Sequence, residues 1–353
     1  MTTHPSHGIP ARRRAGTSAR GSRRRLVALA ALCLALATLC AVGMAVGSRI
    51  VPLHETWSAL WHYSPKNGDH VLIRQVRIPR TAIAVAAGSC LGLAGALTQS
   101  LTRNALAEPG TLGVNHGAAA GVVVGLSASG GSSILVYTWF AFAGAAAAGL
   151  VVHRLGRANE AGENPTRLVL AGAALSILLG STTTIAILSR PETVHESFRG
   201  WATGSLQGRG WESLWVALAC LAVGACIAAI VARSLDVAVL GRDAARGLGA
   251  NTRTTWALAN LAVVVLAGGA TAAVGPVAFV GLAAPHIART VGGPGHARLL
   301  PMSALLGAMA LLTADVLGRV ADYPDEIGAG VTAGLIGAPF FVALVRKGRI
   351  AGI

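Results

Sequence analysis

The sequence has few charged and few aromatic residues. Of its 353 residues, only 12% are Asp, Glu, Lys or Arg and 5% are Phe, Trp or Tyr, whereas 53% are hydrophobic. A soluble domain carries about 25% charged residues, so this composition excludes a soluble globular protein. The chain is predicted to be a polytopic membrane protein.

Lysine is almost absent, because Lys66 and Lys347 are the only two. A Walker A loop, which holds nucleotide phosphates, requires the pattern GxxxxGK[ST]. Pro65 and Arg346 precede the two lysines, so neither belongs to such a loop. The chain is therefore not expected to be an enzyme. ATP-driven work would need a separate ATPase subunit that uses ATP and Mg²⁺, and no cofactor is expected to bind this chain directly.

Metal-ligand spacing is also missing. The five cysteines have neither CxxC spacing nor a partner histidine, and all lie in apolar segments: Cys33, Cys40, Cys90, Cys220 and Cys226. His116 and His286 belong to no HExxH motif and to no other cluster. We interpret all of these as packing residues. The sequence predicts neither a disulfide nor a metal site.

Long apolar runs are plentiful. A helix needs about 20 apolar residues to cross a bilayer. Apolar runs lie near 26–47, 79–100, 112–128, 134–152, 167–189, 212–232, 256–274, 277–288, 301–318 and 327–345. The third and the eighth are short enough to be tilted or incomplete. This pattern predicts an all-α bundle of about ten transmembrane helices.

The basic residues indicate how the chain is threaded. Residues 1–25 are a polar tail with seven arginines, and residues 26–353 are the predicted transmembrane domain. A signal peptide is the alternative interpretation of 26–47, but this run is long and lacks an A-x-A cleavage site. With both termini in the cytoplasm, 20 of the 29 Lys and Arg lie inside, as the positive-inside rule requires. The net charge of +15 therefore reflects membrane topology and does not indicate nucleic-acid binding.

Arg77, Arg80 and Arg319 lie outside in this threading, at the mouths of spans. Cations in such positions either carry a function or snorkel to lipid phosphates. As charges exposed at a mouth, they should mainly steer a charged partner. Asp315 lies four residues before Arg319 on the same helix face, so we expect it to pair with this arginine instead of relaying protons.

Glycine recurs at four-residue spacing in three runs: Gly88 and Gly92, then Gly117, Gly121 and Gly125, then Gly330 and Gly334. This spacing places glycine on one helix face, where two helix backbones can approach closely. The pattern predicts tight packing of many helices and is a weak indication of any function.

The segment 234–255, between two apolar runs, is charged and punctuated by glycine. Its apolar residues recur with helical spacing after Gly241, and Gly247 and Gly249 end the pattern. We predict two short amphipathic helices with a turn at Gly241, an ordered surface on which another protein can push. The alternative is a hairpin that lies in the membrane interface.

Three stretches resemble one known family. They are RIPRTAIAVAAGSCLGLAGALTQSLTRNALAEPGTLGVNHGA (77–118), VGPVAFVGLAAPHIART (274–290) and DEIGAGVTAGLIGAPFFVALVRKGR (325–349). From about residue 26 to the C-terminus, their order and spacing are similar to those of the permeases of ABC importers for iron-siderophores, haem and cobalamin, often called the FecCD family. One difference is Ala105, where the family usually has Pro in an N-P-L-A-E-P run.

The resemblance implies the architecture of a type II ABC importer in a bacterial cytoplasmic (inner) membrane. Two permease subunits of ten helices each would enclose one pathway, and two ATPase subunits would dock on the cytoplasmic side. An extracellular or periplasmic binding protein would deliver the substrate. The sequence leaves open whether two copies of this chain pair or whether it pairs with a sister permease.

The resemblance also implies roles for particular residues. Residues 236–252 match the coupling helices that contact the ATPase, with Gly241, Asp243, Ala244, Ala245, Leu248 and Gly249 as the coupling residues. Arg77, Arg80 and Arg319 match arginines that receive acidic residues of the binding protein. The other motif residues are expected to be structural: Asn104, Glu108, Pro109, Gly275, Pro276, Pro285, His286, Arg289, Gly337 and Pro339.

The run WATGSLQGRGW (201–211) bears on the substrate. It resembles a motif of catecholate siderophore permeases such as those for ferric enterobactin, which predicts import of a ferric siderophore. Such a large chelate needs a pathway lined by small residues and no metal ligands. A haem or cobalamin permease of the same family is the alternative. A proton-coupled transporter that works alone is the alternative from a different class.

Overall fold

The structure is a computed structural model that describes residues 14–47, 51–130, 133–156, 165–238, 247, 251–322 and 325–346. Its helices are α1 (Arg14–Ala45), α2 (Leu53–Trp61), α3 (Gly68–Val71), η2 (Leu72–Arg77), α4 (Ile78–Thr102), η3 (Pro109–Leu112), α5 (Val114–Ser129), α6 (Ile134–Gly156), α7 (Pro165–Leu188), α8 (Glu192–Ala202), α9 (Trp211–Ala238), α11 (Thr252–Val274), α12 (Val280–Gly292), α13 (His296–Ala321) and α14 (Ala329–Arg346). Each of the ten predicted spans corresponds to one helix. The first of these, α1, begins inside the predicted 1–25 tail.

The two spans that were predicted to be short are short in the structure. α5 has 16 residues and α12 has 13, which correspond to about 24 and 20 Å at 1.5 Å per residue. Both lengths are less than the roughly 30 Å of a bilayer core. Among the described residues, eight other helical segments are long and apolar enough to cross a membrane, judged by length and composition.

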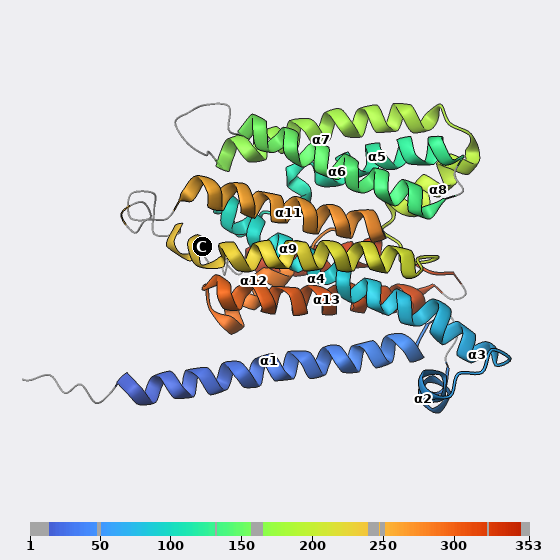
Figure 1. The fold of residues 1–353 in the computed structure, drawn as a ribbon, viewed down its shortest axis with the longest axis horizontal. Helices are drawn as coiled ribbons and strands as arrows, with labels where there is room; N and C mark the ends of the chain where they lie inside the picture. Colours follow the sequence, from blue (N-terminus) through green and yellow to red (C-terminus); the bar gives the residue numbers. More distant parts are fainter. Residues whose placement is uncertain are drawn as a thin grey trace, which may run out of the picture.

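The long helices run side by side and define two ends of the bundle (Figure 1). α2, α3 and α8 lie at one end, which we call the α2 end. α1 begins at the opposite end, which we call the basic end. Helix termini at the basic end carry Arg103, Arg154, Arg167, Arg233, Arg253, Arg289, Arg298 and Arg346. The structure thus groups the arginines that the charge pattern assigned to the cytoplasm.

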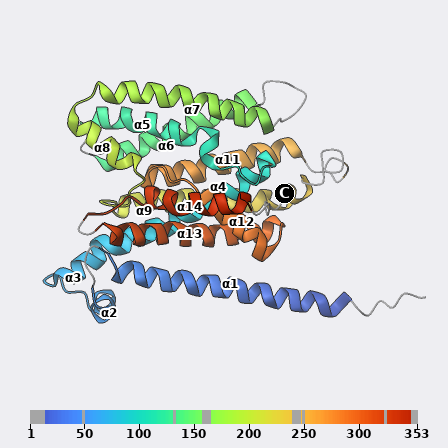
Figure 2. The ribbon, with the colours of Figure 1, turned by 180° about the vertical axis from the view of Figure 1, so that it is seen from behind.

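α4 is the central helix and α1 is the most peripheral. In the helical segment 68–102, which contains α4, 83% of an apolar window of 18 residues is buried inside the chain, whereas 6% of such a window in α1 is buried. α1 lies at one edge of the bundle, and α14 lies on the face turned toward the viewer in Figure 2. Because α1 is apolar and uncovered, its surface is suited to lipid.

Glycine sets the distance between α4 and α13. A Cβ at Gly88 would lie 2.5 Å from the carbonyl oxygen of Gly307, and one at Gly92 would lie 2.0 Å from that of Ser303. Any side chain here would push the two helices apart. The glycines of α5 approach α6 equally closely: Gly117, Gly121 and Gly125. The predicted packing is therefore confirmed for α4 and α5. Within the single chain it does not hold for Gly334, where a Cβ would meet nothing within 4 Å.

Three short helices at the α2 end were not predicted. Pro52 precedes α2 and Pro191 precedes α8, and proline suits a helix start because it lacks an N–H group that would need a partner. The Asn67 side chain accepts the N–H of Asp69 at 3.0 Å and thereby caps α3. These helices are short and partly polar, so a search for long apolar runs cannot detect them.

Candidate functional site

Arg77 and Arg80 lie where α4 begins, and Arg319 lies in the last turn of α13, so all three are at the α2 end. With Asp315 and Glu326 they form a group that we call the arginine cluster. The exposed fractions of the three arginines are only 3%, 5% and 2%. The expectation that they are exposed charges is therefore wrong for the single chain. They do not snorkel to lipid either, because each forms hydrogen bonds inside the protein.

Two carboxylates compensate part of the cluster's charge. Arg80 donates from Nε and Nη2 to Asp315 Oδ1 at 3.0 and 2.8 Å, and from Nη1 to Glu326 Oε2 at 2.6 Å. Arg319 Nη2 lies 3.1 Å from Asp315 Oδ2, an ion-pair distance without hydrogen-bond alignment. The predicted Asp315–Arg319 pair is confirmed. The stronger partner of Asp315 is Arg80, which lies 235 residues away in the sequence and could not be predicted from spacing.

The other guanidinium contacts of the cluster hold the end of α1. Arg77 Nη1 donates to the carbonyl oxygens of Met44 and Ala45, both at 2.8 Å. Arg319 Nη1 donates to those of Gly43 and Val46, both at 3.0 Å. The last carbonyls of a helix lack partners within the helix, and a positive charge there is favourable. Two arginines from other helices thus fix the otherwise weakly packed α1.

The three motif stretches meet in the bundle through Phe279. Its N–H donates to Glu108 Oε1 at 2.6 Å, and a Cβ at Gly337 would lie 2.4 Å from the Cβ of Phe279. Phe279 adopts a left-handed backbone conformation with φ 67°, which a bulky residue rarely adopts. Glu108 and the close approach of α14 therefore hold Phe279 in a strained conformation at the start of α12.

Residues 275–279, which join α11 to α12, are not helical, and Gly275 and Val277 among them are buried. Gly275 has φ 83°, and a Cβ there would lie 2.1 Å from the carbonyl oxygen of Trp201. A Cβ at Gly330 would lie 2.7 Å from the carbonyl oxygen of Pro276. Non-helical backbone within a membrane must be shielded from lipid in this way. Gly275 and Gly330 are thus required by close packing.

Pro109 and Arg289 connect the motifs to α4 and α12. A Cβ at Gly281 would lie 2.9 Å from Cδ of Pro109. Arg289 donates from Nη1 to Gln99 Oε1, and Gln99 Nε2 donates to the carbonyl oxygen of Leu282 at 3.3 Å. Gln99 was not singled out from the sequence, because a lone amide in an apolar run has no recognisable spacing.

The Asn104 side chain closes the turn that follows α4. Its Oδ1 accepts the N–H of Leu106 at 2.9 Å, and Ala105 between them is 8% exposed. This turn is held by Asn104 without the proline that the family usually has. The remaining motif residues lie inside helices: Pro285 and His286 in α12 and Pro339 in α14.

Ser100, His296 and Asp236 form a hydrogen-bonded chain near the basic end. His296 Nδ1 lies 2.6 Å from Asp236 Oδ1, and His296 Nε2 lies 2.7 Å from Ser100 Oγ. The order of these hydrogen bonds, from Ser to His to Asp, matches a catalytic triad. However, Ser100 and His296 are only 9% and 2% exposed, which leaves no room for an acyl substrate. The chain instead joins the ends of α4 and α9 to the start of α13. Sequence analysis missed it because the three residues come from different helices.

The predicted coupling residues lie outside the described residues: Gly241, Asp243, Ala244, Ala245, Leu248 and Gly249. What the structure describes is the two ends of this segment. The carbonyl oxygen of Ala238, the last residue of α9, accepts Arg103 Nη2 at 3.3 Å. The Asn251 side chain caps α11 by accepting the N–H of Thr254 at 3.1 Å. The coupling helices therefore remain a prediction.

Three side chains of the run 201–211 pack inside the bundle, whereas Trp211 at its end is exposed. Trp201 is 2% exposed and Leu206 is 1% exposed. Arg209 Nη1 donates to the Tyr137 hydroxyl at 2.6 Å, and the guanidinium lies 5.3 Å from the centre of the same ring. These three motif residues therefore have packing roles in the single chain.

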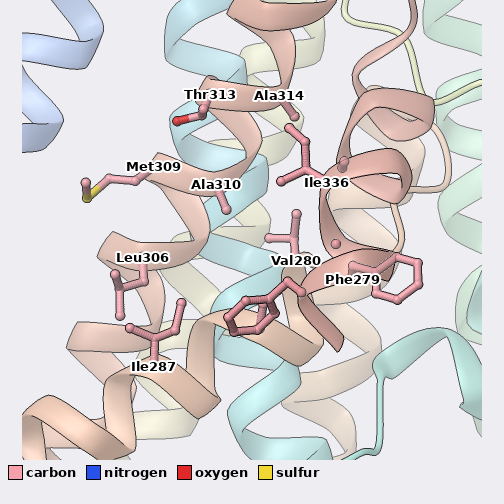
Figure 3. A pocket seen from close by; sticks show the side chains of 13 residues that line it. Phe279, Val280, Ile287, Leu306, Met309, Ala310, Thr313, Ala314 and Ile336 are labelled. Carbon is pink, nitrogen blue, oxygen red and sulfur yellow. The ribbon is translucent and has the colours of Figure 1, made fainter. Parts of the chain in front are cut away.

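A cavity of about 320 Å³ lies between α12, α13 and α14 (Figure 3). Phe279, Val280, Leu306 and Ile336 are among its lining residues, and Thr313 provides the one side-chain hydroxyl. Such a lining can hold an apolar group but not a hydrated ion. Among the described residues, no group of three His, Cys, Asp or Glu side chains could hold a metal ion.

The bundle of ten spans, two of them incomplete, is that of a membrane transport permease. The chain belongs to the FecCD transport family, whose sequence pattern matches residues 32–347. The ferric enterobactin transport system permease protein FepD of Escherichia coli K12 is 40% identical over 324 residues, 92% of this chain and 96% of that protein.

Two further comparisons agree with this family. The iron(3+)-hydroxamate import system permease protein FhuB of Bacillus subtilis 168 is 36% identical over 325 residues, which cover 92% of this chain and 84% of that protein. A solved structure described as an inward-facing metal-chelate type ABC transporter has a TM-score of 0.78 and 26% identity, covering 90% of this chain and 98% of the other. The predicted family and all-α fold are confirmed.

Proposed function

We propose that this chain is the transmembrane permease subunit of an ATP-driven importer for a ferric siderophore. The observation that carries the proposal is the meeting of the three family motifs in one packed unit, through the contacts of Phe279 with Glu108 and Gly337. Sequence identity of 36 to 40% to FepD and FhuB supports iron-chelate transport. Haem and cobalamin remain the alternative substrates within the family.

The chain itself is a non-catalytic subunit in this proposal. ATP and Mg²⁺ are used by two separate ATPase subunits that dock at the basic end, against residues 236–252. The concentration of arginine at that end supports a cytoplasmic location for it. Both termini then lie in the cytoplasm of a bacterium, and the α2 end faces outward. The permease binds no cofactor of its own.

A second permease subunit completes the pathway, either a copy of this chain or a sister permease. Large apolar surfaces are left uncovered by the described part of the chain: only 17% of the apolar part of α7 and 22% of that of α14 are buried. Leu178 and Ile185 of α7, and Leu335 of α14, are each at least 60% exposed. These faces are covered by lipid or by the second subunit.

The outer binding protein docks at the arginine cluster in this proposal. Its three guanidinium groups and two carboxylates give the cluster a net charge of +1, which favours an acidic patch. Glu326 Oε2 accepts Arg80 Nη1 at 2.6 Å, and 12% of the Glu326 side chain is exposed, whereas that of Asp315 is 0% exposed. An incoming carboxylate can therefore replace Glu326 but not Asp315.

Docking is tested with two opposite changes. Arg80→Glu should weaken binding of the partner in a salt-dependent way, and Glu326→Gln should strengthen it, because the competing carboxylate is gone. Glu196→Gln removes an exposed carboxylate from α8 at the same end and serves as the control for total charge. Unchanged binding in both cluster variants would leave the arginines with a purely structural role.

The function as a whole is tested in proteoliposomes. Siderophore uptake should require the ATPase subunits, ATP and the binding protein together. The proton-coupled alternative predicts uptake driven by a pH gradient without the ATPase. Asp315, an acidic group inside the spans, is fully buried and paired with Arg80 and Arg319, which does not favour a proton relay. ATPase-free uptake would overturn the proposal.

A further inference from the structure

Residues 51–77 at the α2 end form a rigid packed unit. Val51, Ala59 and Ile73 make a small apolar core in which each residue is at most 1% exposed. Arg74 Nε and Nη2 donate to two carbonyl oxygens at the end of α2, at 3.0 and 2.8 Å, and satisfy groups that lack partners within the helix. α2 is thus held in one orientation relative to α4.

Polar contacts fix the same unit from another side. His70 Nδ1 accepts the N–H of Ser64 at 3.1 Å, so the proton of a neutral ring lies on Nε2, which faces Glu55 Oε2 at 3.1 Å. Asn67 Nδ2 donates to the same carboxylate oxygen at 3.3 Å. Glu55, the acidic residue of α2, therefore points into the unit and leaves the outer face of the helix without negative charge.

The outer face of α2 carries two exposed tryptophans. Trp57 and Trp61 lie one helical turn apart, are 65% and 68% exposed, and have ring centroids 5.9 Å apart. His54 and His62 beside them are exposed as well. Two large aromatic side chains presented to the outside by a rigid helix indicate a binding surface.

The position of α2 indicates what this surface contacts. The N–H of Val51 donates to the carbonyl oxygen of Ala45 at 3.0 Å, which ties the unit to the end of α1. α1 is the least buried spanning helix of the described chain, at 6%, so the side of α1 that faces away from α13 is suited to lipid. α2 lies just beyond the end of α1 and at the edge of the molecule in both views (Figures 1 and 2). The headgroup layer extends about 5–7 Å beyond each side of the hydrocarbon core, which is the region that a helix just beyond the end of a span enters.

We propose that the Trp57–Trp61 face of α2 binds phospholipid headgroups and anchors the end of α1 in the membrane interface. Tryptophan is enriched at this boundary because its ring is apolar and its N–H is a donor. A short helix with one polar and one apolar face lies in the plane of the interface. Lys66, which is exposed in the same unit, can contact phosphate. The proposal needs neither the substrate nor the partners of the transporter.

Tryptophan fluorescence tests the proposal with the full-length protein. It is reconstituted in vesicles of phosphatidylcholine and phosphatidylglycerol whose acyl chains are brominated either near the headgroup or near the chain end. The difference in emission between wild type and Trp57→Phe/Trp61→Phe gives the signal of the Trp57–Trp61 pair. Trp211→Phe/Trp215→Phe removes a pair of the same spacing at the start of the spanning helix α9. The emission lost in this variant gives the quenching of a pair on a spanning helix, with which the α2 pair is compared. We expect the α2 pair to be quenched more strongly by bromine near the headgroup than near the chain end.

Two other outcomes would overturn the proposal. Quenching by water-soluble acrylamide without quenching by bromine would place the pair in water, and protection from both quenchers would place it against a protein. Amide hydrogen exchange gives a second measurement. In Trp57→Asn/Trp61→Asn, residues 53–61 should exchange at least about tenfold faster in vesicles, the factor that corresponds to about 1.4 kcal/mol, with α4 unchanged. Equal exchange rates in wild type and variant would also refute the anchor.

Discussion

Gly92→Ala is expected to destabilise the bundle although it adds a single methyl group. The ideal Cβ at this position would lie 2.0 Å from the carbonyl oxygen of Ser303 and 2.7 Å from its carbonyl carbon. An ordinary contact requires about 3.5 Å, so α4 and α13 must separate by more than about 1 Å. Both contacting atoms belong to backbone and cannot move aside independently of the helix.

The expected magnitude follows from two opposing effects. Alanine is favoured over glycine within a helix by up to about 1 kcal/mol, whereas overpacking costs about 1–3 kcal/mol. Because α4 is the central helix, its separation from α13 also disturbs the neighbouring contact between Gly88 and Gly307. We therefore expect overpacking at the upper end of that range and a net loss of about 2 kcal/mol.

Gly334→Ala is the matched control, since sequence spacing alone gives Gly92 and Gly334 the same role. A Cβ at Gly334 meets nothing within 4 Å, so this variant should be as stable as wild type or more stable by up to about 1 kcal/mol. Thermal unfolding in detergent, followed by loss of the monodisperse peak in size-exclusion chromatography, compares the variants. Equal midpoints for the two would refute the close approach of α4 and α13.

Three other predictions concern charge, topology and coupling. Asp315→Asn leaves two buried arginines undercompensated and should destabilise the protein by about 3–5 kcal/mol, whereas Asp322→Asn, at an exposed position, should have little effect; similar unfolding midpoints would contradict this. Cysteine at Lys66 should react with an impermeant reagent in whole cells and cysteine at Arg253 only after permeabilisation, and the reverse result would invert the orientation. Gly249→Val should cost roughly 1–2 kcal/mol locally and separate ATP hydrolysis from uptake, so normal uptake would mean that this residue has no coupling role.

Sequence alone determined the fold class, the positions of the ten spans and the family. Burial in lipid requires long apolar runs, and helix is the local structure that satisfies every backbone group within such a run. Even the incomplete spans, α5 and α12, were evident from their length. Residue spacing of four also gave the Asp315–Arg319 pair, because both residues lie on one turn of a single helix.

The tertiary structure decided which residues meet across helices. Arg80 forms hydrogen bonds with Asp315 and Glu326, which lie 235 and 246 positions away in the sequence. No spacing rule covers such separations. For the same reason the sequence could suggest that the arginines are exposed, whereas packing buries all three. Gly92 and Gly334 have the same local pattern, yet only Gly92 faces another backbone. Periodicity defines the face on which a residue lies, but what occupies the space opposite that face depends on how distant segments of the chain pack together.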